Sequence, residues 1–352
     1  MHLDKGKKPE SYLLYTKTKI KAIIFGIIVL FFIVLYSISV GPVNIPLDCV
    51  IKTLMGITIN DNWDSIIWNI RLPEITAGIV AGVGLSIAGV AMQSILRNPL
   101  GEPYTLGISH AAAFGAAFSV MFLSSGVYGD NIVISNPYLT TMVAFLFSLL
   151  ATFMILLVAR CRPSSPEVMI LAGVAFGSLF IAARMFLEYF ANDIQLASIV
   201  FWTFGNLSRA AWDEIIIMAV ATIIISLFFF SHRWSFNAID AGDETAQSLG
   251  IDVKKVRLLG MVASSFLAAV ITSFLGVIGF VGLVAPHMVR RVIGDDNRFL
   301  IPGSCVTGAI MLVSADTVAR TIMAPTVLPV SILTAFLGAP MFLYLLLKGW
   351  SR

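Results

Sequence analysis

The sequence predicts an all-α polytopic membrane protein with about ten transmembrane helices, and three observations support that prediction. Of its 352 residues, 58% are hydrophobic and 12% are charged, whereas soluble domains have about 45–50% and about 25%. The apolar residues fall in long blocks without charges rather than at amphipathic spacing. Six lysines precede the first block, residues 22–40, as is typical of a first span with a cytoplasmic flank.

The spans can be counted from the charge-free blocks, which are 22–40, 75–96, 103–129, 131–159, 168–183, 215–230, 258–289, 299–315 and 321–347. Because a span needs about 20 residues, block 258–289 is either one overlong helix or two helices that turn near Gly276 and Gly279. Ten spans place 18 of the 23 basic residues on the cytoplasmic side, and nine spans place 14 there. The positive-inside rule therefore favours ten spans with both termini cytoplasmic.

The expected organisation is a cytoplasmic segment, residues 1–21, followed by a single transmembrane domain, residues 22–349, in the cell membrane. Its longest cytoplasmic connection is 231–257. The first apolar block exceeds the apolar core of about 7–15 residues in a cleavable signal peptide, so we expect an uncleaved span. The net charge of +3 does not indicate nucleic-acid binding, because the early lysines mark the membrane flank.

The chemistry-bearing residues do not predict an enzyme, a metal site or a bound cofactor. Cys49, Cys161 and Cys305 are odd in number and far apart, which favours packing roles. His287 lacks an HExxH pattern and precedes two arginines, so we interpret it as the edge of a span. The chain has no GxxxxGK[ST] motif and is not expected to bind ATP phosphates itself.

Several local patterns predict packing. Gly78 and Gly82 form a GxxxG pattern, which lets helix backbones approach closely in lipid. The stretch RNPLGEPYTLG, residues 97–107, predicts a rigid, non-helical cytoplasmic turn. Arg184 and Glu188 are spaced for an ion pair. Trp202 and Trp212 are typical of a membrane interface.

The connection 231–257 predicts two short helical segments separated by Gly242. Asp243 and Glu244 suit the first turn of the second segment, and Gly250 suits its end. Ala246 and Leu249 lie three residues apart, which predicts a small apolar face. A two-turn helix is not stable alone in water, so this face packs either on the protein's own inner surface or on a soluble partner.

Four passages resemble permease subunits of ATP-binding-cassette (ABC) importers for iron–siderophores, haem and cobalamin, the FecCD-type family. The passages are RLPEITAGIVAGVGLSIAGVAMQSILRNPLGEPYTLGIS (71–109), GDETAQSLGI (242–251), GFVGLVAPHMVRRVIGDDNRFLIPGS (279–304) and ADTVARTIMAPTVLPVSILTAFLGAPMFLYLLLKG (315–349). The family has a ten-span fold, in agreement with the count from the basic residues.

The resemblance implies three sets of site residues. Glu244-x-Ala246-x3-Gly250 resembles the motif that couples importer permeases to their ATPase subunits. Outward-facing arginines of the family dock a substrate-binding protein, and a segment before the fifth span forms a cytoplasmic gate. The implied residues are Gly242, Asp243, Glu244, Ala246, Leu249 and Gly250 for coupling; Arg71, Arg320 and Glu74, which replaces an arginine of some members, for docking; and Ser164, Ser165, Pro166 and Glu167 for the gate.

The resemblance thus implies a permease subunit that imports a metal chelate and is not itself an enzyme. Its implied partners are two ATPase subunits, a second permease chain in a homodimer, an extracytoplasmic substrate-binding protein and membrane lipid. The alternative is an ion-coupled secondary transporter, which would place ionisable residues at the midplane of the membrane. The acids that we assign to the spans, Glu188, Asp193 and Asp316, are all expected near outer ends, which disfavours that alternative.

Overall fold

The computed structural model describes residues 10–123, 125–128, 131–134, 137–161 and 166–348, and it is a bundle of helices. Its elements are α1 (Glu10–Ser39), α2 (Leu47–Leu54), α3 (Asp61–Ile66), a π-helical turn (Ile67–Arg71), α4 (Leu72–Ile95), α5 (Ile108–Phe122), β1 (Ser125–Tyr128), β2 (Asn131–Ile134), α6 (Pro137–Cys161), α7 (Pro166–Phe190), α8 (Asp193–Thr203), a 3₁₀ turn (Leu207–Arg209), α9 (Trp212–Ser231), α10 (Arg233–Asp240), α11 (Asp243–Ser248), α12 (Val253–Leu275), α13 (Val281–Ile293), α14 (Asn297–Thr321) and α15 (Val330–Lys348).

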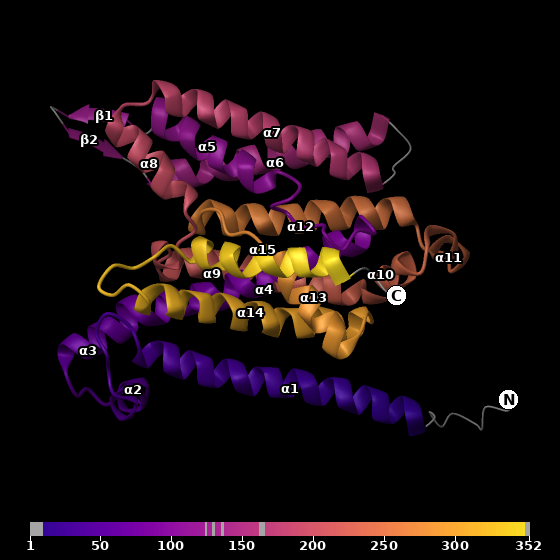
Figure 1. The fold of residues 1–352 in the computed structure, drawn as a ribbon, viewed down its shortest axis with the longest axis horizontal. Coiled ribbons are helices and arrows are strands. Elements are labelled where there is room, and N and C mark those ends of the chain that lie inside the picture. The colour runs from indigo at the N-terminus through magenta and orange to yellow at the C-terminus, as the bar shows by residue number, and fades with distance from the viewer. Residues whose placement is uncertain (1–9, 124, 129–130, 135–136, 162–165, 349–352) are drawn as a thin grey trace.

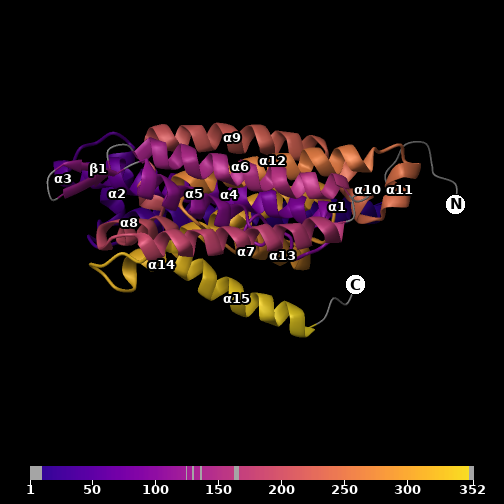
Figure 2. The same cartoon turned by 90° about the horizontal axis from the view of Figure 1, so that it is seen from above.

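The long helices run side by side, so the bundle has two ends. Short helices α10 and α11 lie at one end, near the start of α1, and we call it the α11 end (Figure 1). Short helices α2, α3 and α8 lie at the opposite end with the β1–β2 hairpin, and we call it the α3 end. Figure 2 shows α15 leaning away from the rest of the bundle toward the α11 end.

Helix α4 is the centre of the bundle. In its most apolar stretch 78% of the residues are buried, compared with 17% in α1. A Cβ added at Gly82 would overlap the backbone of Gly308 in α14, and one added at Gly89 would overlap the backbone of Gly282 in α13. Small residues therefore bring these helices into backbone contact, as the GxxxG pattern predicted for Gly82.

The described residues contain seven helices that are long and apolar enough to cross a membrane, together with shorter apolar helices. These seven helices confirm the prediction of a helical membrane protein. Block 258–289 contains two helices, because α12 ends at Leu275 and Gly276 adopts a φ of +81°. This backbone conformation favours glycine, and α13 begins five residues later.

Some predicted boundaries were wrong. Residues 125–128 and 131–134 lie within blocks predicted as spans, yet they form an antiparallel hairpin with Tyr128 opposite Asn131. The strands are rich in β-branched residues, which fit a pleated backbone, and the absence of charge does not distinguish a short strand from a helix. Helices α2 and α3 were also not predicted, since their polar residues interrupt any apolar block.

Candidate functional site

The loop between α9 and α12 has the predicted two-helix form. Gly242, with a φ of +125°, separates α10 from α11, and Gly250, with a φ of +79°, follows α11. Asp243 and Glu244 occupy the first turn of α11, where the positive end of the helix dipole favours carboxylates. The two glycines allow backbone turns that other residues rarely adopt, and they direct α11 across the end of the bundle.

Ala246 and Leu249 do not form the single apolar face that their spacing predicted. Ala246 is fully buried within the chain itself, in a cluster that includes Ile239 of α10 and Val253 of α12. Leu249 follows the last helical residue, and 67% of its surface is exposed. The helix ends between the two residues, so their side chains have different surroundings. The exposed residues of α11 and its end are Glu244, Thr245, Gln247, Ser248, Leu249 and Gly250.

An ion pair attaches α11 to the long helices. Arg257 of α12 donates from Nη1 and Nη2 to the two carboxylate oxygens of Asp243, at 2.9 and 2.8 Å. The Nε atom of Arg257 donates to the carbonyl oxygen of Ile95, the last residue of α4, at 3.1 Å. Arg97 adds a longer contact to Asp243 at 3.7 Å. The sequence does not predict these contacts, because Asp243 and Arg257 lie 14 residues apart with a turn between them.

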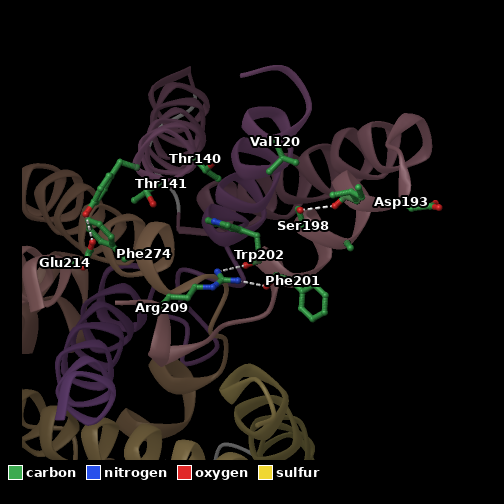
Figure 3. A pocket seen from close by; sticks show the side chains of 13 residues that line it. Val120, Thr140, Thr141, Asp193, Ser198, Phe201, Trp202, Arg209, Glu214 and Phe274 are labelled. Atoms are coloured by element: carbon green, nitrogen blue, oxygen red, sulfur yellow. Dashed lines mark hydrogen bonds between the residues drawn. The ribbon is translucent and has the colours of Figure 1, made fainter. Parts of the chain in front are cut away.

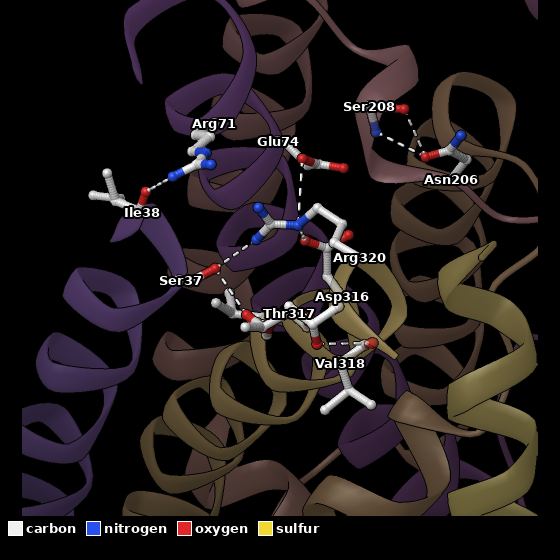
Figure 4. A network of polar contacts seen from close by, with 12 residues as sticks. Ser37, Ile38, Arg71, Glu74, Asn206, Ser208, Asp316, Thr317, Val318 and Arg320 are labelled. Carbon is white, nitrogen blue, oxygen red and sulfur yellow. Dashed lines mark hydrogen bonds and ion pairs between the residues drawn. The ribbon is translucent and has the colours of Figure 1, made fainter. Parts of the chain in front are cut away.

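Arg71, Glu74 and Arg320 do meet at the α3 end, but they form an internal cluster (Figure 4). Arg320 Nε lies 2.8 Å from Asp316 Oδ2 and 3.5 Å from Glu74 Oε2. Its Nη2 donates to Ser37 Oγ at 2.7 Å.

The arginines were expected to face outward, and the structure corrects that expectation. Arg71, Glu74 and Arg320 each expose 3% of their surface. Arg71 donates to the backbone carbonyl oxygens of Ile38 and Val43 at the end of α1. Two guanidinium groups and two carboxylates therefore satisfy one another and the local backbone, since buried charges are costly without partners. The cluster holds the ends of α1, α4 and α14 together.

The predicted gate lies partly outside the described residues, because Ser164 and Ser165 are not among them. Pro166 and Glu167 form the start of α7, where proline needs no backbone partner and a carboxylate favours the helix dipole. This end of α7 is therefore a helix terminus of ordinary composition.

The segment 97–107 is non-helical, as predicted, but it enters the bundle rather than remaining on its surface. Glu102 exposes 2% of its surface. Its Oε1 accepts a hydrogen bond from the backbone N–H of Phe280 at 3.2 Å, directly before α13. Gly282, in the first turn of α13, packs against Gly89 in the second half of α4. The segment therefore reaches the start of a helix that begins deep inside the bundle.

Several other side chains have clear positions. Arg184 and Glu188 form the expected ion pair, with Nε and Oε1 3.3 Å apart. His110 stacks in a tilted arrangement on Tyr104, with ring centroids 4.9 Å apart. His287 is the middle residue of α13. Within the described part of the chain, no group of three His, Cys, Asp or Glu side chains is placed to hold a metal ion.

A cavity of about 880 Å³ opens at the α3 end (Figure 3). Arg209 donates from Nη1 to the Trp202 carbonyl oxygen at 3.0 Å and from Nη2 to that of Phe201. Burial lowers the pKa of Arg209 to about 10. Across the cavity, Tyr138 donates its hydroxyl to Glu214 at 2.9 Å. The remaining wall has four apolar residues, Val120, Ile194, Ala197 and Phe274, and four polar ones, Thr140, Thr141, Asp193 and Ser198.

A family model described as the FecCD transport family matches residues 28–348. The chain belongs to the FecCD transport family. The match includes the last part of α1 and every later long helix, and it confirms the resemblance found in the sequence.

Three FecCD relatives show how far the similarity extends. An ABC transporter permease protein of Methanocaldococcus jannaschii is 52% identical over 349 residues, which cover 98% of this chain and 99% of the relative. The hemin transport system permease protein HmuU of Yersinia pestis is 34% identical over 90% of this chain and 93% of its own length. A solved metal-chelate type ABC transporter in an inward-facing conformation has a TM-score of 0.81 and 27% identity, over 94% of this chain and 99% of its own.

FecCD membership decides between the two functions that the sequence suggested. The chain is a multi-pass permease of an ABC importer in the cell membrane. Its role is transport, and the ion-coupled secondary transporter is no longer an alternative. Similarity over nearly the full length of both chains means that this conclusion applies to the whole permease domain.

Proposed function

We propose that two copies of this chain form the pathway of a metal-chelate importer, with an ATPase subunit docked on α11 of each copy and a substrate-binding protein docked at the α3 end. The exposed face of α11 carries the proposal. Ala246 anchors the helix from beneath, which leaves Leu249 as an apolar side chain that is 67% exposed. A single exposed leucine is ordinary on a protein surface, so the proposal rests on its position at the end of the helix that resembles the coupling motif.

The ten-span topology with both termini cytoplasmic remains part of this proposal. The ten helices would be α1, α4, α5, α6, α7, α9, α12, α13, α14 and α15. Three of these ten are not among the seven long apolar helices. They are α5, α13 with 13 residues and α15 with 19 residues. The α11 end carries Lys254, Lys255 and Arg291, as the cytoplasmic side of a membrane protein does.

Helix α15 supports the homodimer. It leans away from the bundle (Figure 2), and its Phe336 and Leu337 expose 74% and 54% of their surfaces. A symmetric pair is the commonest arrangement of identical chains, and a second copy packed along this helix would enclose a pathway beside it. Pro166 and Glu167, with Ser164 and Ser165 before them, are proposed to lie at the gate of that pathway.

The substrate is proposed to be a metal chelate of the haem, iron–siderophore or cobalamin type. A relative named for hemin transport and a solved metal-chelate transporter support this class. At the α3 end, the Arg71–Glu74–Arg320 cluster would support the docking surface from within, because it fixes the three helix ends on which a binding protein would rest.

A pair of substitutions tests the docking proposal. Leu249→Asp introduces a carboxylate. A docked ATPase subunit would remove water from this carboxylate without supplying a hydrogen bond or counter-charge, at a cost of several kcal/mol. We expect the variant to insert in the membrane and to lose co-purification of the ATPase. Met55→Asp is the matched control for co-purification of the ATPase, since Met55 is an apolar residue 73% exposed at the end far from α11. Full ATPase binding and uptake by Leu249→Asp would refute docking at this face.

A further inference from the structure

The last turn of α4 contacts three other helices through three consecutive residues. Gln93 Nε2 donates to the carbonyl oxygen of Gly282 at 3.2 Å, and Gln93 Oε1 accepts from Arg290, so both contacts reach α13. Ser94 Oγ donates to Asp240 of α10 at 3.0 Å. The carbonyl oxygen of Ile95 accepts from Arg257 of α12. This turn, Gln93–Ile95, is therefore a junction between the α11 end and the interior of the bundle.

Arg257 connects that junction to α11. Its side chain is 7% exposed, and one planar guanidinium group holds both oxygens of Asp243 and the end of α4 at once. A fork of two parallel N–H donors fixes the orientation of a carboxylate as well as its distance. Of the other contacts of α11 with the bundle, the apolar burial of Ala246 has no directional preference, and Arg97 reaches Asp243 only at 3.7 Å. Arg257 is thus the directional attachment.

We propose that Arg257 is a positioning residue that transmits the displacement of α11 to α4 and, through Gln93, to α13. This inference rests on the proposed function, in which an ATPase subunit moves α11. A six-residue helix has too little internal stability to act as a lever by itself, so its motion reaches the pathway only through its attachments. A loose attachment would let the ATPase cycle without moving the pathway helices.

The variant Arg257→Lys tests the transmission step. Lysine retains the charge and the aliphatic stem but offers a point charge in place of the planar fork. We expect the purified complex to keep its ATPase subunits and its basal ATP hydrolysis, while substrate uptake per ATP hydrolysed falls by about ten-fold. Gln93→Met removes the next link, between α4 and α13, and should reproduce the effect if Arg257→Lys fails to fold.

Arg97→Lys is the matched control. Arg97 contacts the same carboxylate at 3.7 Å and its side chain is 44% exposed, so its replacement should leave uptake per ATP within about two-fold, as expected for exposed ion pairs. A second measurement reports the motion directly. A spin label at Val292→Cys of α13 in each copy, with Cys49, Cys161 and Cys305 replaced by serine, should change its distance from the label of the other copy when ATP is added to the complex. This change should disappear in Arg257→Lys.

The outcomes separate this inference from the docking proposal. Normal ATPase binding with uncoupled hydrolysis and a lost distance change would support the role of Arg257. Unchanged uptake per ATP in both Arg257→Lys and Gln93→Met would overturn it. Loss of ATPase binding in Arg257→Lys would also overturn it, because Arg257 would then only shape the docking surface. Failure of the docking proposal itself would appear in the Leu249→Asp experiment, which leaves Arg257 intact.

Discussion

Glu102 and Phe280 are separated by 178 residues, and the carboxylate of the first accepts a hydrogen bond from the backbone N–H of the second at 3.2 Å. Phe280 has a φ of +69°, in the left-handed region, and stands directly before α13. The N–H groups at the start of a helix have no partner within that helix. Glu102 therefore supplies the acceptor that lets α13 begin inside the bundle.

Replacement of Glu102 by leucine should destabilise the permease by about 1–3 kcal/mol, because the buried N–H of Phe280 would lose its acceptor. Glu102→Gln retains a carbonyl oxygen and should cost less. Thermal unfolding of the two purified variants in detergent measures the difference. Equal destabilisation by leucine and glutamine would contradict a hydrogen-bonding role.

Gly89→Ala should lower the stability of the bundle strongly, since an added methyl group overlaps the backbone of Gly282. Gly279→Ala is the control, because its added methyl group would lie 3.4 Å from the ring of Tyr104, an ordinary contact distance. Overpacking of a dense core costs typically about 1–3 kcal/mol. Fluorescence-detected thermal unfolding should give Gly89→Ala a much lower melting temperature than Gly279→Ala. The reverse order would contradict the close approach of α4 and α13.

Arg320→Met should destabilise the α3 end by about 3–5 kcal/mol, because it leaves Glu74 and Asp316 as buried carboxylates without a counter-charge. Adding Glu74→Gln and Asp316→Asn to the same chain should restore much of the loss. The free energy of unfolding of the single and triple variants provides the measurement. A single variant as stable as the unmodified chain would show that the cluster is exposed to solvent in the membrane.

Ala246→Arg should disrupt α11 in the isolated permease, before any ATPase is present. The site is fully buried against α10 and α12, and a guanidinium group there would be desolvated without a partner. Limited proteolysis of the variant should cut the connection 231–257 faster than in the unmodified chain. Equal cleavage of both chains, with loss of ATPase binding alone, would instead favour direct contact of Ala246 with the partner.

Labelling of single cysteines tests the proposed topology. Ser208, in the turn before α9, and Asp295, between α13 and α14, are both exposed. Ten spans place them on opposite sides of the membrane, and nine spans place them on the same side. In a background in which Cys49, Cys161 and Cys305 are serines, an impermeant thiol reagent should label Ser208→Cys from outside and Asp295→Cys only after the membrane is opened. Labelling of both from the same side would contradict the ten-span count.

The sequence predicted the helices better than it predicted their contacts. Long apolar blocks and flanking lysines are strong signals, and Gly276 correctly indicated the division of block 258–289. The pair Asp243–Arg257 was not predictable, because its partners lie 14 residues apart with a turn between them. The direction in which Arg71 points depends on the carbonyl oxygens of Ile38 and Val43. These residues are 33 and 28 positions away in the chain, so the sequence around Arg71 does not predict it.

The π-helical turn Ile67–Arg71 controls the rotational phase between α3 and α4. An α-helix rotates by about 100° per residue, and a π turn accommodates one additional residue without advancing the helix by a normal step. Deletion of one residue from this turn would regularise the helix and swing α2 and α3 around the axis of α4. A change of length at this single place would thus reorient the loops of the α3 end without any change in the sequence of the packed helices. One insertion or deletion in this turn could therefore adapt the permease to a different partner.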